Sequence, residues 1–455
     1  MKGKRIHFCG VAGTGLSSLA RLARWRGARV SGSDRDFDRN RCRSRLNSLR
    51  ADGIIIVPQN GAGASGADLV VSSAAVESEI PDLAEARRMG VPVVSRADFL
   101  CRLASQSRRL AVAGTNGKSS VTALLAWILH RTGRDPTVAL GAALRGDWGG
   151  VENARAGNSA FFCFEADESD GGLPRYRPEV GLVTNISRDH FPLKKLQDIF
   201  SEFAASTTGI LVLNGDNPAS GSLAEKAPAS ITFALDQPAD LRARNLVLGR
   251  EGLSFTLGRT ACKIPLLGRH SAANSLAALA AAGAIGIKIE EAAEALRDFP
   301  GLERRLEVVG RKGDVTVLDD YAHNPAKIKA ALAAGRLLGK RLIVVYRPHG
   351  FGPLRSLLSE YAEAFGSGLM RGDVLLLLPV YDAGGTADRS IDSAELAQAI
   401  AGEAPVLLVE EAVEAARAAA KAARRGSVVI VMGARDPALP DLSRKILGLL
   451  EAAGG

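Results

Sequence analysis

The sequence LAVAGTNGKSSVTALLAWIL, residues 110–129, decides how the middle of this chain folds. A short apolar run enters a turn that contains two glycines, and a longer apolar run begins soon after the turn. A glycine turn between a strand and a helix lets backbone N–H groups converge on an anion, whose charge the helix N-terminus favours. The stretch therefore predicts a phosphate-binding loop made of Gly114, Thr115, Asn116, Gly117, Lys118, Ser119 and Ser120.

Lys118 and Ser119 indicate what this loop binds. A lysine at this place reaches the β- and γ-phosphates of a nucleotide, and the hydroxyl beside it can join the ligands of Mg²⁺. The alternative is a chance glycine-rich turn, which the apolar runs on both sides argue against. We therefore expect ATP and Mg²⁺ to bind here.

Two polar stretches follow later strand-like runs. EADESD, residues 165–170, comes after the apolar residues 161–164, and NISRDH, residues 185–190, ends the next such run. Open α/β sheets bind ligands at the carboxyl ends of their strands. Mg²⁺ prefers carboxylates together with substrate phosphates, and a neutral imidazole such as that of His190 can serve as a further ligand. The alternatives are a solvated acidic loop and a structural histidine.

The same order of strand, glycine turn and helix recurs along the whole chain. Strands are expected at 5–9, 28–31, 54–57 and 69–73, then at 110–113, 161–165, 181–185 and 211–214, and finally at 315–318, 342–345, 374–378 and 428–431. The pattern predicts an α/β protein with mostly parallel sheets. We expect three domains, at residues 1–107, 108–302 and 303–455: a Rossmann-like domain, a P-loop ATPase-type domain and a second Rossmann-like domain.

The composition excludes several classes of protein. The chain has 455 residues, 46% of them apolar and 24% charged, as in folded proteins of two or three domains. The net charge of +9 comes without a basic block interleaved with aromatics, which argues against a nucleic-acid partner. The apolar runs are too short to cross a bilayer, so we expect a protein that does not insert into membranes. The N-terminus does not read as a secretory leader, and the five cysteines are scattered, which predicts a cytoplasmic protein. The oligomeric state stays open between monomer and homodimer.

The first and last regions carry weaker signals. Gly10, Gly13 and Gly15 follow the first strand with GxxGxG spacing, and Asp34 ends the second. This turn predicts a site for a nucleotide-like phosphate; a dehydrogenase is the alternative, but it leaves the phosphate loop unexplained. In the last region, DDYAHNP at residues 319–325 follows a strand and opens a helix that Asn324 is expected to cap.

Taken together and in this order, GTNGKSS, EADESD, NISRDH, GRHSAANSLAA (residues 268–278) and DDYAHNP resemble the Mur ligase family over essentially the whole chain. The resemblance implies a ligase that uses ATP to join an amine to the carboxylate of a UDP-linked sugar acid. It implies that Ser119 and Glu165 hold one Mg²⁺ and His190 a second, with Lys118, Glu165 and His190 as catalytic residues. Asn274 would face the adenine, and Arg305 and Asp320 would complete the ATP site.

Within the family, the first glycine turn and PVYDAGG at residues 379–385 are similar to the branch that adds L-alanine to UDP-N-acetylmuramate. Where that branch carries two arginines, this chain has Gly350 and Pro353. The amine therefore stays open between L-alanine, a murein peptide and another amine, and a scaffold with a degenerate site is a further alternative. The resemblance implies that the substrates contact Gly10, Gly13, Gly15, Asp34, Ser73, His323, His349 and, in place of the arginines, Arg355.

Overall fold

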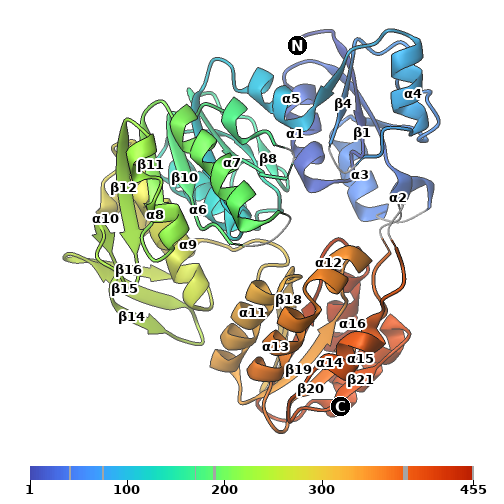
Figure 1. Cartoon of the computed structure of the whole chain (residues 1–455), viewed down its shortest axis with the longest axis vertical. Helices are drawn as coiled ribbons and strands as arrows, with labels where there is room; N and C mark the ends of the chain where they lie inside the picture. The colour runs from blue at the N-terminus through green and yellow to red at the C-terminus, as the bar shows by residue number, and fades with distance from the viewer. Residues whose placement is uncertain (40–42, 74–75, 170, 188–190, 383–387, 453–455) are drawn as a thin grey trace. The chain divides into compact units, whose positions relative to one another are not determined.

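The chain folds into helices and mostly parallel sheets, as Figure 1 shows. The computed structural model describes residues 1–39, 43–73, 76–169, 171–187, 191–382 and 388–452. Contacts divide the chain into two compact units: unit 1 contains residues 1–246, 254–264 and 272–300, and unit 2 contains residues 247–253, 265–271 and 301–455. The α/β fold class predicted from the sequence is confirmed, whereas the three domain ranges stay a prediction.

The first sheet of unit 1 is wholly parallel, with the strand order β3-β2-β1-β4-β5. The order reverses between β1 and β4, and ligands of open α/β sheets bind outside the carboxyl ends of strands at such a point. The first glycine turn lies there, directly after β1. The strands are β1 (Arg5–Cys9), β2 (Arg29–Ser33), β3 (Ile55–Ile56), β4 (Leu69–Ser72) and β5 (Val93–Ser95), and the helices are α1 (Thr14–Trp25), α2 (Arg35–Asp38), α3 (Arg43–Ala51), α4 (Pro81–Arg88) and α5 (Arg96–Leu103).

The second sheet of unit 1 has eight strands in the order β13-β12-β11-β10-β6-β9-β7-β8. All its pairs are parallel except β7 with β8. β6 lies between β10 and β9, so the loops that follow these three strands meet at one edge. The strands are β6 (Arg108–Ala113), β7 (Thr137–Ala139), β8 (Ala154–Arg155), β9 (Phe161–Glu165), β10 (Val180–Val183), β11 (Ile210–Asn214), β12 (Ala229–Ala234) and β13 (Leu241–Arg242).

Helices and short 3₁₀ turns connect these strands, and a small third sheet follows them. The sheet has the order β14-β15-β16, and the sequence analysis missed it because its short strands carry no glycine turn and helix between them. Its strands are β14 (Arg244–Leu248), β15 (Leu253–Leu257) and β16 (Thr260–Ile264). The helical segments are α6 (Lys118–Arg131), η1 (Leu173–Arg175), α7 (Leu193–Ser206), α8 (Pro218–Gly221), η2 (Ala224–Lys226), α9 (Arg269–Ala284), α10 (Ile289–Ala295) and η3 (Leu296–Asp298).

The sheet of unit 2 has the order β17-β18-β22-β19-β20-β21, and only β17 runs antiparallel to its neighbour. The four inner strands, β18, β22, β19 and β20, are buried on both faces, which explains their nearly continuous apolar sequences. Alternate residues supply two separate cores: Val344 and Ile430 face one, and Ile343 and Val429 face the other. The strands are β17 (Glu307–Lys312), β18 (Val315–Asp320), β19 (Arg341–Tyr346), β20 (Val374–Leu377), β21 (Val406–Leu408) and β22 (Ser427–Met432).

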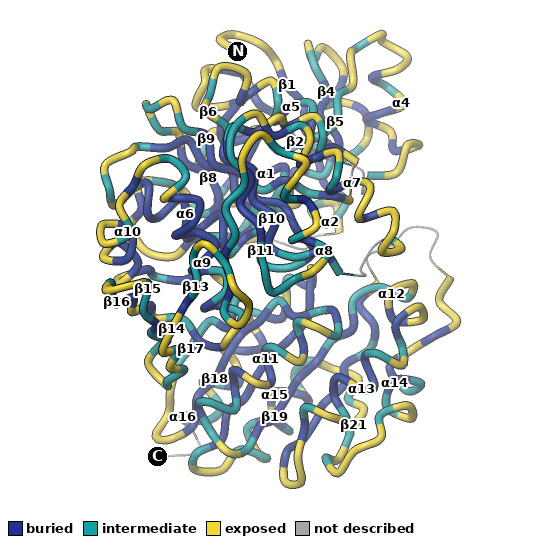
Figure 2. The backbone as a smooth tube through the Cα atoms, turned by 60° about the vertical axis from the view of Figure 1, so that its left-hand side comes forward, coloured by how far each residue is buried: buried dark blue, intermediate teal, exposed yellow. Residues whose placement is uncertain are grey.

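Helices cover both faces of this sheet, and the strands appear as the buried part of the backbone in Figure 2. Residues of α11 and α13 enter the core that contains Val344, and residues of α15 and α16 enter the core that contains Ile343. The helices are α11 (Pro325–Leu338), α12 (Phe351–Ser356), α13 (Leu358–Gly368), α14 (Ser393–Ala399), α15 (Ala412–Ala422) and α16 (Leu439–Ala452). Among the described residues, none of the helices is long and apolar enough to cross a membrane.

A buried arginine joins α1 to neighbouring segments of unit 1. The side chain of Arg21 is fully buried, and its guanidinium donates to Asp52 at 2.6 Å and to Glu152 at 3.0 Å. It also donates to Ser48 Oγ at 2.8 Å and to Asn153 Oδ1 at 2.7 Å. A buried guanidinium is stable only when its donors are satisfied, and here four side chains from two parts of the sequence satisfy them.

Candidate active site

The phosphate loop runs from the end of β6 to the first turn of α6, where the sequence predicted it. Gly114 and Gly117 have φ angles of 129° and 87°, in the region that favours glycine. A Cβ on Gly114 would lie 2.0 Å from Thr184 Oγ1, so no side chain fits there. The glycines therefore allow a turn that packs directly against the segment after β10.

Hydrogen bonds fix the loop to the segment that follows β10. Thr115 N donates to Asn185 O at 2.9 Å, and Asn116 N donates to Asn185 Oδ1 at 3.1 Å. Thr184 Oγ1 in turn donates to Asn116 O at 2.6 Å. The N–H groups at the start of α6 have no carbonyl partner within the helix and are suited to bind an anion. The loop is thus held in shape before a nucleotide binds.

Lys118 is held by one carboxylate and one carbonyl. Its Nζ donates to Glu168 Oε2 and to Gly114 O, each at 2.7 Å. Burial alone would lower the pKa of Lys118, but the charges of Glu168 and Asp167 raise it above its ordinary value. Lys118 is therefore a permanent cation in this loop. The role of Glu168 could not be predicted from the sequence, because the pairing joins residues from two different loops.

Ser119 and Glu165 lie together at the same edge of the sheet. Ser119 Oγ donates to Glu165 Oε2 at 3.1 Å, which brings together two oxygen donors of the kind that Mg²⁺ prefers. The backbone N–H of Gly141 donates to Glu165 Oε1. A Cβ on Gly141 would lie 2.6 Å from Glu165 Oε2, so a glycine is needed there for the carboxylate to keep its place.

Arg96 is a cation that the sequence analysis missed. It begins α5, and its side chain lies over the first glycine turn, 3.2 Å from where a Cβ of Gly15 would be. Its guanidinium is 3.8 Å from Asp167 Oδ2. Burial raises the pKa of Asp167, but the charges of Lys118 and Arg96 outweigh it and hold that pKa below its ordinary value. Arg96 thus connects the glycine turn after β1 with the acidic loop after β9.

The structure describes the positions of two of the three other residues that were expected at the nucleotide site. Ser120 occupies the first turn of α6. Asn274, on α9, lies against the loop, with its Oδ1 2.5 Å from where a Cβ of Gly117 would be. His190 lies outside the described residues. The described part of the predicted nucleotide site in unit 1 is therefore one cluster at the carboxyl ends of β6 and β9.

The residues expected to bind the sugar substrate lie at the carboxyl ends of β1, β2 and β4. Gly10 has a φ of 82° and starts the turn between β1 and α1 that also contains Gly13. Asp34 holds this turn, because its Oδ2 accepts from Ala12 N at 2.9 Å and its Oδ1 accepts from Asp36 N at 3.0 Å. Ser73 follows β4 directly. The carboxylate of Asp34 thus shapes the turn by accepting hydrogen bonds from backbone N–H groups.

In unit 2, Asp320 has a similar positioning role. Its two oxygens accept from Leu306 N at 2.6 Å and from Ala322 N at 2.7 Å. Burial raises its pKa, and the nearby charge of Arg305 opposes that effect. The guanidinium of Arg305 lies over the ring of Tyr321, 4.8 Å from its centroid. These contacts fix the backbone on both sides of the end of β18.

Two histidines follow β18 and β19, the strands on either side of β22. His323 Nδ1 is 2.8 Å from Tyr321 O, which makes Nδ1 the protonated nitrogen of a neutral ring. Burial and the charge of Lys327 hold its pKa well below the ordinary value. Burial and the charge of Arg435 lower the pKa of His349 to about 4. Both histidines are therefore neutral at pH 7.

Two further predictions concern residues near these histidines. Asn324 caps α11, because its side chain accepts from Lys327 N at 3.0 Å, as expected. Arg355 is engaged with a nearby loop: its guanidinium donates to Ser390 Oγ at 2.8 Å and lies 3.1 Å from Asp388 Oδ2. A carboxylate partner thus already neutralises Arg355, the residue proposed in place of the two arginines.

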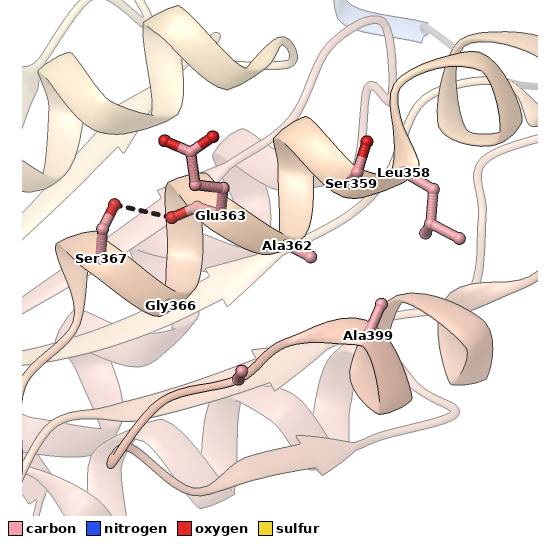
Figure 3. A pocket seen from close by; sticks show the side chains of 8 residues that line it. Leu358, Ser359, Ala362, Glu363, Gly366, Ser367 and Ala399 are labelled. Atoms are coloured by element: carbon pink, nitrogen blue, oxygen red, sulfur yellow. Dashed lines mark hydrogen bonds between the residues drawn. The ribbon is translucent and has the colours of Figure 1, made fainter.

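A groove of about 640 Å³ lies between α13 and the end of α14, but it lacks the chemistry of a ligase site (Figure 3). It is lined mostly by small and apolar residues. Among the described residues of its lining, the only carboxylate belongs to Glu363, which pairs with Lys329 at 2.6 Å. Its described lining holds no cation that could bind a phosphate, and it lies apart in sequence from both clusters described above.

Models of protein families match most of the chain. Residues 5–108 match the Mur ligase family catalytic domain, residues 112–282 the Mur ligase middle domain, and residues 304–435 the Mur ligase glutamate ligase domain. Among solved structures, a UDP-N-acetylmuramate–alanine ligase from Thermotoga maritima has a similar fold, with a TM-score of 0.80, 24% identity and 99% of both chains covered. A murein peptide ligase from Psychrobacter arcticus gives a TM-score of 0.74 at 22% identity, covering 98% of this chain and 99% of its own.

Curated relatives match over nearly their full length. A UDP-N-acetylmuramate–L-alanine ligase from Gloeobacter violaceus is 34% identical, with 99% of this chain and 96% of the relative covered. A protein of the same name from Anaeromyxobacter dehalogenans is 36% identical, with 98% of each chain covered. With three matching domain models in sequence, this chain belongs to the Mur ligase family.

Proposed function

We propose that this protein is an ATP-dependent ligase that joins L-alanine to the carboxylate of UDP-N-acetylmuramate, in the synthesis of peptidoglycan precursors. The full-length similarity to curated ligases with this activity carries the proposal. The cluster around the phosphate loop supports it, because Lys118, Ser119 and Glu165 are gathered where a nucleotide and a cation would bind. A scaffold with a degenerate site would not need to keep this set of groups.

Lys118 is the residue that acts on the phosphates. A carboxylate and ATP repel each other because both are anionic, and a cation at the γ-phosphate lowers that repulsion. One oxygen of the sugar carboxylate attacks the γ-phosphorus, the bond to the β–γ bridging oxygen breaks, and ADP leaves. The amine nitrogen then attacks the acyl carbon, the bond to the phosphate oxygen breaks, and phosphate leaves as the amine loses its proton.

Mg²⁺ is part of the proposal, with Ser119 and Glu165 as its ligands. Their oxygens lie 3.1 Å apart beside the phosphate loop, and hydroxyl and carboxylate oxygens suit this hard cation. When bound, the ion would neutralise phosphate charge and hold the γ-phosphate in line with the attacking oxygen. Lys118 then keeps the phosphate loop and the acidic loop together through Glu168.

Each unit carries residues that are expected to contact a substrate. UDP-N-acetylmuramate would bind at the first glycine turn, where Arg96 supplies a positive charge beside Gly15. Arg305 would contribute to the ATP site.

The proposal includes a cytoplasmic location, because ATP and UDP-linked sugars are found in the cytoplasm. Fractionation of producing cells should leave the activity in the membrane-free supernatant. Activity confined to membranes would contradict this location.

Phosphate release by the purified protein tests the proposed reaction. With ATP, Mg²⁺ and UDP-N-acetylmuramate, we expect release that requires L-alanine and stops when EDTA removes the cation. Glycine, L-serine and a murein tripeptide, each offered instead of L-alanine, test the identity of the amine. Release with the tripeptide alone would identify a murein peptide ligase, and silence with every amine despite ATP binding would indicate a scaffold.

A further inference from the structure

The loop after β22 lies between the loops that carry the two histidines. β22 pairs with β18 on one side and with β19 on the other, in both cases in parallel. The carboxyl ends of these three strands therefore lie side by side. His323 follows β18, His349 follows β19, and Arg435 follows β22. The order of strands alone puts Arg435 in the middle position of this edge.

Neighbouring segments hold the backbone before Arg435 in place. Gly433 N donates to Asp320 O at 3.3 Å, and Gly433 O accepts from the guanidinium of Arg304 at 2.7 Å. On the other side, Arg347 N donates to Met432 O at 3.0 Å. The loop is therefore tied to the ends of both β18 and β19.

Arg435 itself adopts a conformation that side chains rarely adopt. Its φ is 55°, in the left-handed region that glycine occupies without strain. Residues other than glycine persist in this region only where the surrounding structure fixes them, and such residues gather at functional sites. An exposed arginine in this place gains nothing from core packing that would offset the strain. The strain alone assigns no role, since the exposed Arg177 has a φ of 42°, but at Arg435 it coincides with a place between the two histidine loops.

The guanidinium of Arg435 has no carboxylate partner among the residues that the structure describes. The adjacent Asp436 pairs instead with Arg347, at 2.8 Å. The guanidinium of Arg347 also donates to Pro379 O and lies over the ring of Tyr381, 5.6 Å from its centroid. These contacts of Arg347 hold the loops after β19, β20 and β22 together. Arg435 is left as a cation that can bind an external anion.

His349 follows β19, the strand beside β22. Its ring stacks on Tyr381, with 5.9 Å between the ring centroids and 29° between the planes. Its Nδ1 is buried and, within the described ranges, has no hydrogen-bond partner. The charge of Arg435 acts on His349, and the two histidines act on each other. A cation and two neutral imidazoles therefore share one small region.

We propose that Arg435 binds the α-carboxylate of the incoming amino acid and directs its amino group toward His349. The proposal rests on the proposed function, which requires an amino acid as the second substrate. An amino acid presents an anion at one end and an ammonium at the other. A guanidinium matches the anion through two parallel hydrogen bonds, and a neutral imidazole nitrogen of His349 can accept from the ammonium. His323 contributes by position only, because its Nε2 already lies 3.4 Å from Lys327 Nζ.

The test compares L-alanine with L-alaninamide, which lacks the carboxylate, in the wild type and in the Arg435→Gly variant. The variant should raise the KM for L-alanine about 10- to 100-fold, as expected when a hydrogen bond between two charged groups is lost. The KM for L-alaninamide, ATP and UDP-N-acetylmuramate should stay the same. Arg435→Lys should recover part of the loss, because it restores the charge without the planar pair of donors.

The Arg435→Gly substitution also removes the backbone strain, so the melting temperature of the variant should not fall. The matched control is Arg177→Gly in unit 1, where another exposed arginine has a φ of 42°. It should leave all four KM values unchanged. An equal loss with L-alaninamide, an unchanged KM for L-alanine, or a loss seen only in Arg355→Ala would overturn the proposal. If the proposed function itself is wrong, the wild-type protein will not release phosphate with L-alanine, a result that differs from all three of these.

Discussion

Replacing Lys118 with alanine is expected to lower kcat by about 1,000-fold, the loss typical when a charge-stabilising group is removed from a transition state. Lys118 is the cation at the phosphate loop, and its ammonium is already oriented by Gly114 O and Glu168. UDP-N-acetylmuramate should still bind with nearly unchanged affinity, because the residues expected to bind it follow β1, β2 and β4. Steady-state phosphate release and calorimetric titration of the UDP-sugar measure the two effects.

The controls for this variant separate chemistry from folding. Burial already raises the pKa of Glu168, and without Lys118 its carboxylate has lost a partner. The double variant Lys118→Ala with Glu168→Gln removes that unpaired charge, and it should be as inactive as the single variant. Lys226→Ala, at an exposed lysine of unit 1, should keep wild-type turnover. Unchanged ATP consumption in Lys118→Ala would show that the phosphate loop has been assigned wrongly.

Replacing Arg21 with methionine is expected to destabilise unit 1 by about 3 kcal/mol, because it leaves carboxylates without their buried partner. The expected loss is at the low end for a buried ion pair, because the side chains of Asp52 and Glu152 are 12% and 34% exposed. For a unit of this size the first thermal transition should fall by about 6–12 °C. Differential scanning calorimetry measures the shift.

The matched control lies one turn further along α1. Arg24 is exposed, and its guanidinium donates to Gly53 O at 3.2 Å. Arg24→Met should change stability by no more than about 0.5 kcal/mol, as is usual for surface substitutions. Equal melting temperatures for the Arg21 and Arg24 variants would mean that the hydrogen bonds of Arg21 contribute nothing to the stability of unit 1.

Local sequence predicted the strands well where an apolar run ends in a glycine turn. β1 and β9 have the predicted bounds, and the remaining predicted strands differ from the structure by a few residues at their ends. Such runs are bounded by signals within the sequence itself. The strands β7, β8 and β13 were missed because each has only two or three residues, too few for a pattern, and only pairing with a neighbour makes it a strand. The antiparallel β17 pairs with the adjacent β18 and was missed because its sequence, EVVGRK, is not an apolar run.

The candidate site was predictable in part. The sequence located Lys118 and Ser119, because their role depends on a turn between a strand and a helix. It could not show that Glu168 holds Lys118, or that Arg96 reaches Gly15, since both contacts join separate loops. Arg435 was equally hidden, because its importance depends on the position of β22 in the sheet and on a positive φ.

The most direct test of the proposed ligase mechanism follows an oxygen atom from the sugar carboxylate to the released phosphate. UDP-N-acetylmuramate labelled with ¹⁸O in its carboxylate is incubated with the protein, ATP, Mg²⁺ and L-alanine, and the released phosphate is analysed by mass spectrometry. If the carboxylate attacks the γ-phosphorus, one labelled oxygen passes to phosphate for each amide formed. Phosphate without label, alongside ATP consumption, would contradict the proposed ligase mechanism.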